Sequence, residues 1–119
     1  MKYIFSLLVL SSFLLFSCSN EKIGEKLEGK WNIENAFRNG RKTSTLEQTY
    51  FIFQNSDILE TNLLGSKVNS NYSLKKNVII SDNNLPEIIV KKIENDSLIF
   101  EFTIEDNHFE LTMIKSSDE

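Results

Sequence analysis

A single histidine, His108, is the first residue to consider for chemistry, because imidazole can act as an acid–base group or a metal ligand. It follows Asp106-Asn107, a pair typical of a tight turn. No His-x-His spacing exists, because His108 is the only histidine, and a zinc site would have too few histidine and cysteine ligands. We therefore expect His108 to be a solvated hairpin residue, and we expect no metal site.

Carboxylates are the second candidates, since an enclosed pair can serve as general acid and base. Six of them gather late in the chain: Glu94, Asp96, Glu101, Glu105, Asp106 and Glu110. Alternation of the neighbouring apolar residues places Glu101, Glu105 and Glu110 on the outward face of two expected strands. The sequence also has no nucleophile elbow, phosphate-binding loop or dinucleotide fingerprint. We predict neither catalytic residues nor a cofactor, and we expect that the protein is not an enzyme.

Cys18 is the only cysteine, and it stands directly after a short apolar segment. Lys2 supplies a positive charge, and Ile4–Phe16 is apolar apart from three serines. This layout is typical of a secretory signal. The segment falls short of the roughly 20 apolar residues that a membrane-spanning helix needs. An ordinary signal peptide that leaves a free thiol at Cys18 is the alternative interpretation.

Leu15-Phe16-Ser17-Cys18 resembles the lipobox of bacterial lipoproteins, although Phe16 departs from the small or aliphatic residue usual there. The resemblance implies cleavage between Ser17 and Cys18 and attachment of fatty-acyl chains, such as palmitate, to Cys18. Several acyl chains would hold the protein stably at a membrane. We therefore expect residues 1–17 to be a signal peptide and the mature protein to be a lipoprotein of the cell envelope, anchored at the outer membrane.

The mature chain would contain 102 residues (119 less 17), which fits one small domain. Cleavage removes one lysine and no acid, so the formal charge changes from −4 to −5, which argues against a nucleic-acid partner. Residues 18–26 are polar around Gly24 and are predicted to form a lipidated tether. Residues 116–119 form a short polar tail. We expect a monomer.

From residue 28 onward, short alternating segments separated by turn residues favour strands and hairpins. Eight strands are predicted, at Lys30–Phe37, Gln48–Gln54, Asp57–Leu64, Lys67–Leu74, Asn77–Asp82, Glu87–Glu94, Ser97–Glu105 and His108–Lys115. Asn39-Gly40 favours a type I′ turn, because both residues tolerate positive φ. Short connections pair consecutive strands. With no predicted helix to cover the apolar face, closure into a small all-β antiparallel barrel is the expected fold.

Leu27-Glu28-Gly29-Lys30-Trp31 precedes the first strand and resembles the entry motif of lipocalins and of lipocalin-like domains in Bacteroidetes lipoproteins. The resemblance implies a barrel over residues 27–115, in which Gly29 lets the chain turn into the barrel and Trp31 plugs the closed end. Lys115 matches the basic residue that stacks on this tryptophan in lipocalins. The Thr-Asp-Tyr-like turn motif of lipocalins is missing, and the chain is short for that family.

Two functions remain open at this point. The first is binding of a small apolar or amphipathic ligand inside the barrel, in a cavity lined by Phe51, Phe53, Phe100, Phe102, Phe109 and Met113, with residues 41–47 as a polar lid. The second is a structural or protein-interaction role in the envelope, because small barrels are often filled by their own side chains. Tyr50, Ile52 and Ile99 would then lie on the outer face. Asp96-Ser97-Leu98 also resembles an O-glycosylation signal of exported Bacteroidetes proteins, which a turn-to-strand junction explains equally well.

Overall fold

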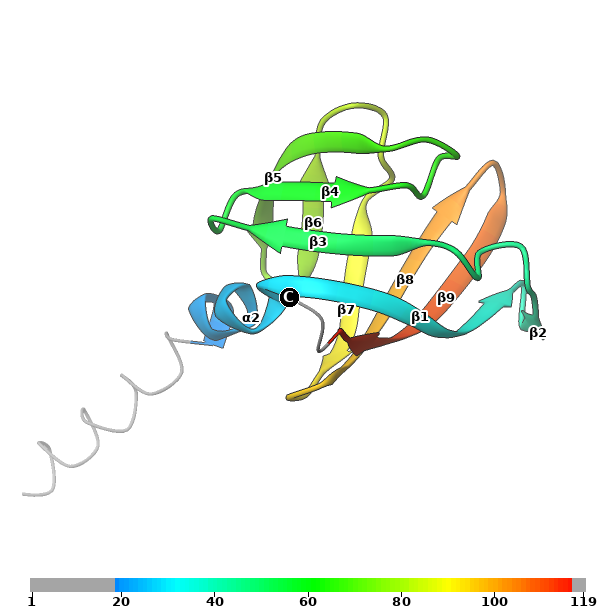
Figure 1. The fold of residues 1–119 in the computed structure, drawn as a ribbon, viewed down its shortest axis with the longest axis horizontal. Coiled ribbons are helices and arrows are strands. Elements are labelled where there is room, and N and C mark those ends of the chain that lie inside the picture. The colour runs from blue at the N-terminus through cyan, green and yellow to red at the C-terminus, as the bar shows by residue number, and fades with distance from the viewer. Residues whose placement is uncertain (1–18, 117–119) are drawn as a thin grey trace, which may run out of the picture.

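A computed structural model describes residues 19–116, with side chains described from Ile23 onward. In this part of the chain, the helix α2 (Ser19–Leu27) precedes a series of antiparallel strands (Figure 1). The strands are β1 (Gly29–Arg38), β2 (Arg41–Lys42), β3 (Tyr50–Gln54), β4 (Ile58–Thr61), β5 (Val68–Lys75), β6 (Val78–Ser81), β7 (Ile88–Ile93), β8 (Ser97–Ile104) and β9 (Asn107–Lys115).

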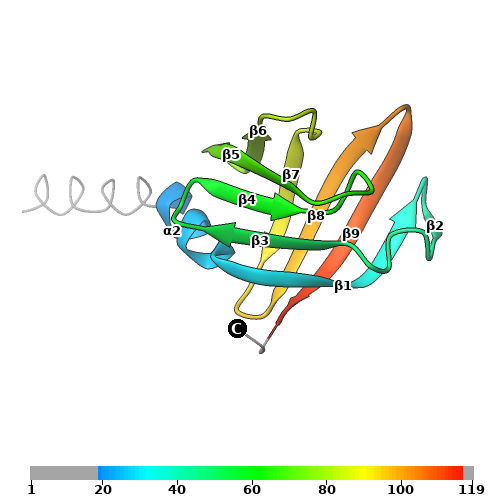
Figure 2. The same cartoon turned by 45° about the horizontal axis from the view of Figure 1, so that its top comes forward.

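The strands form one sheet that closes on itself. Neighbours along the chain pair from β3 through β9, and β1 pairs with β3 on one side and with β9 on the other. The short β2 folds back on the end of β1 and extends the sheet beyond the barrel (Figure 2). The predicted up-and-down barrel of eight strands is therefore confirmed, with β2 as an additional strand.

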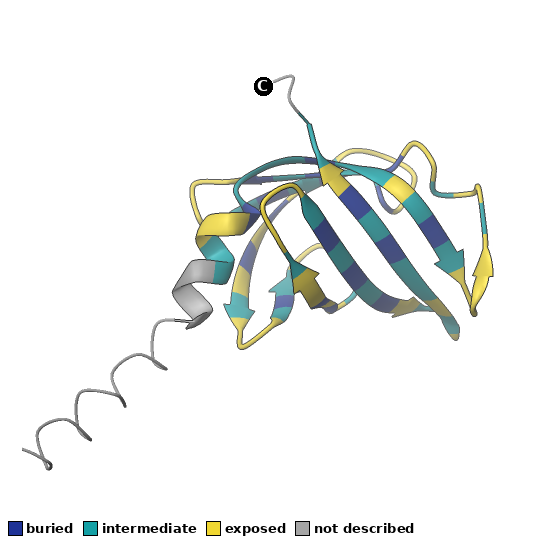
Figure 3. Ribbon diagram, turned by 90° about the horizontal axis from the view of Figure 1, so that it is seen from below, coloured by how far each residue is buried: buried dark blue, intermediate teal, exposed yellow. Residues whose placement is uncertain are grey.

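Residues along the strands alternate between the barrel interior and its outer face, as Figure 3 shows by burial. In β8, Leu98, Phe100 and Phe102 are buried, whereas Ile99 and Glu101 are half-buried on the outside. Period-two alternation places every second side chain on the same face of a strand. The apolar faces predicted from the sequence therefore meet in one core.

The two ends of the barrel are built from different segments. The end that we call the closed end carries α2 and the turns at residues 55–57, 76–77 and 94–96 (Figure 1). The end that we call the open end carries the β1–β2 hairpin and the connections at residues 43–49, 62–67, 82–87 and 105–106. The predicted lid segment, residues 41–47, lies at the open end.

Most of the segment predicted to be a polar tether, residues 18–26, is helical, because the helix α2 covers Ser19–Leu27. Ile23 and Leu27 are four residues apart, so they share one face of the helix. Leu27 is completely buried, and Ile23 packs against the core. A Cβ at Gly24 would lie 3.6 Å from Leu74 Cδ1, which shows how closely the helix approaches β5. The polar composition of this segment does not predict a helix, and contact with the barrel therefore stabilises it.

The turns follow the predicted positions closely. Asn39 and Gly40 both have positive φ, of 52° and 82°, as a type I′ turn requires. The segment after this turn was predicted to be a lid, but its first two residues form β2. The final hairpin turns at Glu105-Asp106, one residue before the predicted Asp106-Asn107. The shift is consistent with the register that keeps Phe102 opposite Phe109 in the core.

Candidate functional site

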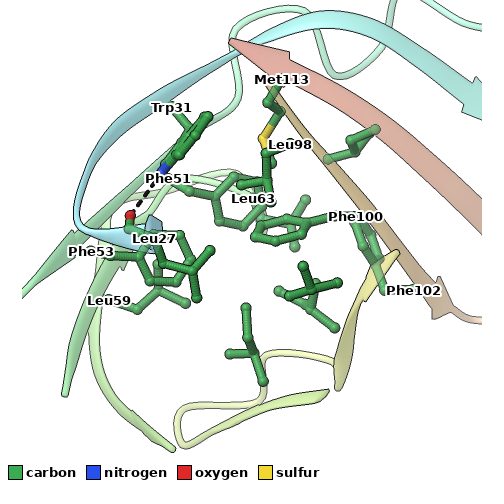
Figure 4. Close-up of a cluster of buried hydrophobic side chains, with 14 of the residues drawn as sticks. Leu27, Trp31, Phe51, Phe53, Leu59, Leu63, Leu98, Phe100, Phe102 and Met113 are labelled. Atoms are coloured by element: carbon green, nitrogen blue, oxygen red, sulfur yellow. Dashed lines mark hydrogen bonds between the residues drawn. The ribbon is translucent and has the colours of Figure 1, made fainter. Parts of the chain in front are cut away.

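Trp31 occupies the closed end and is completely buried. Its Nε1–H donates a hydrogen bond to the Leu27 carbonyl oxygen at 2.8 Å, which joins the end of α2 to β1 (Figure 4). Gly29, between them, has a φ of 120°, a conformation that glycine adopts without a steric penalty. The indole therefore contributes both packing and a satisfied polar group where the barrel closes.

Lys115 lies beside Trp31, as the lipocalin resemblance implies. The two residues pair across β1 and β9. The Lys115 Nζ lies 5.5 Å from the centroid of the Trp31 ring, within the range of a cation–π contact. The chain thus brings the entry motif and the last strand together at one point.

The six residues predicted to line a cavity all face inward, but they pack against one another. The ring centroids of Phe51 and Phe100 are 5.2 Å apart in an edge-to-face arrangement, and Phe53 approaches Tyr72 at 5.3 Å in the same way. Phe102 stacks on Phe109 at 5.5 Å. Met113 is completely buried among the same core residues (Figure 4). Aromatic side chains therefore occupy the centre of the barrel.

The open end differs because its apolar residues are only partly covered. Leu46, Ile104 and Phe109 pack against the core but remain half-buried, and Leu64 is 43% exposed. Leu46 comes from the loop after β2, where Thr49 N–H donates to its carbonyl oxygen at 3.0 Å. These four residues, which we call the apolar lip, leave apolar surface accessible at one end of the barrel.

Asn39 fixes the β1–β2 hairpin against the first residues of β9. Its backbone N–H donates to the His108 carbonyl oxygen at 2.7 Å, and its side-chain oxygen accepts from the His108 N–H at 2.9 Å. Its side-chain nitrogen also donates to Asn107 Oδ1 at 3.1 Å. The hairpin beside the apolar lip is therefore held at a defined position.

His108, predicted to be a solvated hairpin residue, lies on the outer face with its side chain half-exposed, and it also approaches a carboxylate. Its Nε2 is 3.2 Å from Glu101 Oε2. Lys91 Nζ lies 3.0 Å from Glu110 and 3.3 Å from Glu101 and bridges these cross-strand carboxylates. Hydrogen bonds to Glu110 and then Glu101 raise the pKa of Lys91. This exposed network offsets like-charge repulsion between the glutamates.

Two inward-facing hydroxyls have no partner in the described structure: Tyr72 Oη and Ser81 Oγ. They belong to residues directly opposite each other on β5 and β6. Burial, followed by the negative charges of Glu28 and Asp57, raises the pKa of Tyr72 to about 12. The nearby Ser70, in contrast, donates to the Asp82 carbonyl oxygen at 3.1 Å. The wall formed by β5 and β6 therefore carries polar groups into an otherwise apolar interior.

The predicted lipidation site and cleavage position, Cys18 and Ser17, lie outside the described residues. Within residues 19–116, no helix is both long and apolar enough to cross a membrane. The same residues contain no cluster of three or more histidine, cysteine or acidic side chains placed to hold a metal ion.

Sequence reasoning placed a polar lid, residues 41–47, at the mouth of the barrel, but it did not identify the apolar lip or the pairing of Arg38 with Arg41. One signal was available: a two-residue Asn39-Gly40 turn places Arg38 opposite Arg41 in a hairpin. Leu46 gave no signal, because a single leucine in a polar loop has no periodicity.

No family model matches the sequence, and neither does any curated protein. Among solved structures, a lipocalin-like protein from Bacteroides uniformis is similar, with a TM-score of 0.54 and 21% sequence identity. The alignment covers 76% of this chain and 99% of that protein. Together with the closed eight-stranded meander, this similarity shows that the chain has a lipocalin-like fold.

Proposed function

We propose that the protein is a lipid-anchored protein of the cell envelope that binds a small amphipathic molecule at the open end of its barrel. One observation carries this proposal: apolar residues at the open end are partly uncovered, whereas the centre and the closed end are filled. Apolar surface with polar neighbours is typical of ligand sites. The ligand would contact Leu46, Leu64, Ile104 and Phe109.

The place of α2 supports an orientation for this binding. Ser19, the first residue of α2, follows Cys18 directly, and α2 lies at the closed end (Figure 1). A lipid on Cys18 would therefore hold the closed end near the membrane and direct the apolar lip away from it. The protein would then receive its ligand from the aqueous side of the envelope.

The ligand proposal is tested with the unlipidated mature chain (residues 18–119 with Cys18→Ser), which keeps every residue of the described core. Decyl maltoside, below its micelle concentration, is titrated by calorimetry into this protein and into two variants from β9. Phe109→Ala removes part of the apolar lip, and we expect severalfold weaker binding. Ile114→Ala is the matched control, because Ile114 is exposed on the outer face. Equal binding by both variants, or no binding by the parent chain of this or any charged decyl amphiphile, would rule out the proposed site.

The anchor is tested separately by growing cells with a radioactive fatty acid. We expect label in the full chain and none in the Cys18→Ser full chain. Equal label in both would overturn the lipid-anchor proposal, whatever the titration shows.

A second function, protein interaction in the envelope through the outer face, is favoured by the filled interior and by two exposed isoleucines. Ile89 is 36% and Ile114 is 43% exposed on strands of one sheet. A photo-crosslinking residue at Ile114, compared with one at Leu64 on the apolar lip, separates the two functions in living cells. A discrete protein adduct from position 114 supports the second function. Adducts only with lipid-sized molecules from position 64 support the first.

A further inference from the structure

The two arginines of the sequence face each other across the β1–β2 hairpin. Arg38 and Arg41 are directly opposed, and directly opposed residues project on the same face of a sheet. Like charges in this position destabilise a hairpin. Repulsion between the two arginines therefore destabilises the hairpin, and the fold does not need arginine at these two positions.

Neither arginine has an ion-pair partner among residues 19–116. Glu105 and Asp106 lie in the turn that borders the hairpin, and they too form no ion pair with either arginine. The chain has more acidic than basic residues, so acidic partners are plentiful elsewhere. Two exposed guanidinium groups thus remain available to a negative group from outside the molecule.

The register also relates this pair to the apolar lip. Arg38 is opposite Phe109 across β1 and β9, and Phe109 belongs to the inward-facing set of residues. Arg38, and with it Arg41, therefore projects on the face that continues the barrel interior. A surface hollow of about 520 Å³ is lined by Arg38, Asn39, Arg41, Lys42 and Thr43. The hydrogen bonds of Asn39 hold this cationic hairpin in place.

We propose that Arg38 and Arg41 bind the negatively charged head group, a phosphate or a carboxylate, of an amphiphile whose alkyl chain lies on the apolar lip. This rests on the proposed function and names the class of its ligand. Guanidinium groups bind both kinds of oxyanion through paired N–H donors. An anion between them would also remove the repulsion between the two arginines. Phe109, which lies opposite Arg38, would cover the first part of the alkyl chain.

The test compares three decyl amphiphiles of equal chain length, all below their micelle concentrations: decyl phosphate, decanoate and neutral decyl maltoside. Inorganic phosphate serves as a head group without a chain. Calorimetric titrations use the unlipidated mature chain, the double variant Arg38→Gln/Arg41→Gln and the matched control Lys75→Gln/Lys76→Gln. The control removes the same charge at the closed end, where both lysines are exposed. Thermal unfolding of each variant establishes that it is folded.

We expect at least one anionic amphiphile to bind about tenfold more tightly than the maltoside, a difference of about 1.4 kcal/mol. The arginine variant should lose this advantage, the lysine variant should keep it, and inorganic phosphate should bind more weakly than decyl phosphate. Whichever of decyl phosphate and decanoate binds more tightly identifies the preferred head group.

Equal affinity for charged and neutral amphiphiles, unchanged in the arginine variant, would overturn the charge selectivity and leave the proposed function standing. Absence of binding by all three amphiphiles would overturn both proposals. Equal affinity for decyl phosphate and inorganic phosphate would show that the alkyl chain does not contribute to binding. The proposal of an amphiphilic ligand would then be wrong, and the arginine pair would be a site for a free anion.

Discussion

The closed and open ends of the barrel use aromatic and basic residues in opposite ways. At the closed end, Trp31 is buried and hydrogen-bonded, and Lys115 lies over its ring. At the open end, Phe109 is only half-buried, and Arg38 projects on the same face without an ion-pair partner among the described residues. An aromatic and a basic residue thus lie together at each end. At the closed end they seal the barrel, and at the open end they remain accessible to a ligand.

This difference indicates which end stabilises the fold and which end is free to bind. Side chains that are fully packed contribute most to stability, and their loss leaves cavities. Half-buried side chains contribute less, so they can be replaced or covered by another molecule at smaller cost. Substitutions at the two ends should therefore separate stability from binding.

The largest effect is expected from Trp31→Ala, which should lower the free energy of unfolding by about 3–5 kcal/mol. It removes the largest completely buried side chain and the hydrogen bond to Leu27. Phe109→Ala at the open end should cost clearly less, about 1–2 kcal/mol, because partial burial yields only part of the transfer free energy of a phenylalanine. Urea unfolding of the unlipidated mature chain measures both. Equal losses would mean that the two ends contribute equally to stability.

Lys115→Ala should lower the free energy of unfolding by about 0.5–2 kcal/mol and change the tryptophan fluorescence, because the ammonium group leaves the indole face. Trp31 is the only tryptophan, so the spectrum reports on the surroundings of this one residue. Lys92→Ala serves as the control, because Lys92 is exposed and paired only with exposed Glu94. Unchanged stability and fluorescence in Lys115→Ala would contradict a role for the cation–π contact.

Tyr72→Phe should leave stability at pH 7 unchanged or slightly raised, since it removes a buried hydroxyl without a partner. The free energies of unfolding of the parent protein and the variant should differ at alkaline pH. The folded pKa of Tyr72 is about 12 and the ordinary value is 10.0, so the unfolded chain loses its proton first as the pH rises. The free energy of unfolding of the parent protein should therefore fall between pH 10 and pH 12 more steeply than that of the variant.

Tyr50→Phe provides the contrast, because the Tyr50 hydroxyl donates to Glu60 at 2.8 Å. This variant should lose stability at pH 7, where Tyr72→Phe does not. A clear loss for Tyr72→Phe at pH 7 would mean that its hydroxyl has a partner after all.

Most of the barrel could be predicted from local pattern, because alternation in β8 and β9 assigns a face to each residue and the turns mark each reversal. The contact between Trp31 and Lys115 could be predicted only through the resemblance to lipocalins, since the residues lie 84 positions apart (115 less 31). The sequence did not predict the helix α2, because only two apolar residues, Ile23 and Leu27, have helical spacing, and two residues are too few to establish a periodic pattern. The difference between a filled core and a lined cavity depends on how side-chain volumes fit together in three dimensions, and the sequence pattern is the same for both.

The central claim, that the open end binds and the closed end is sealed, is tested most directly by amide chemical shifts during titration of the unlipidated mature chain with decyl phosphate. We predict perturbations at residues 37–49, 62–67 and 104–110, with the amides of α2 and of residues 94–98 unchanged. Perturbations centred on Trp31 and α2, or the absence of any perturbation, would contradict the claim.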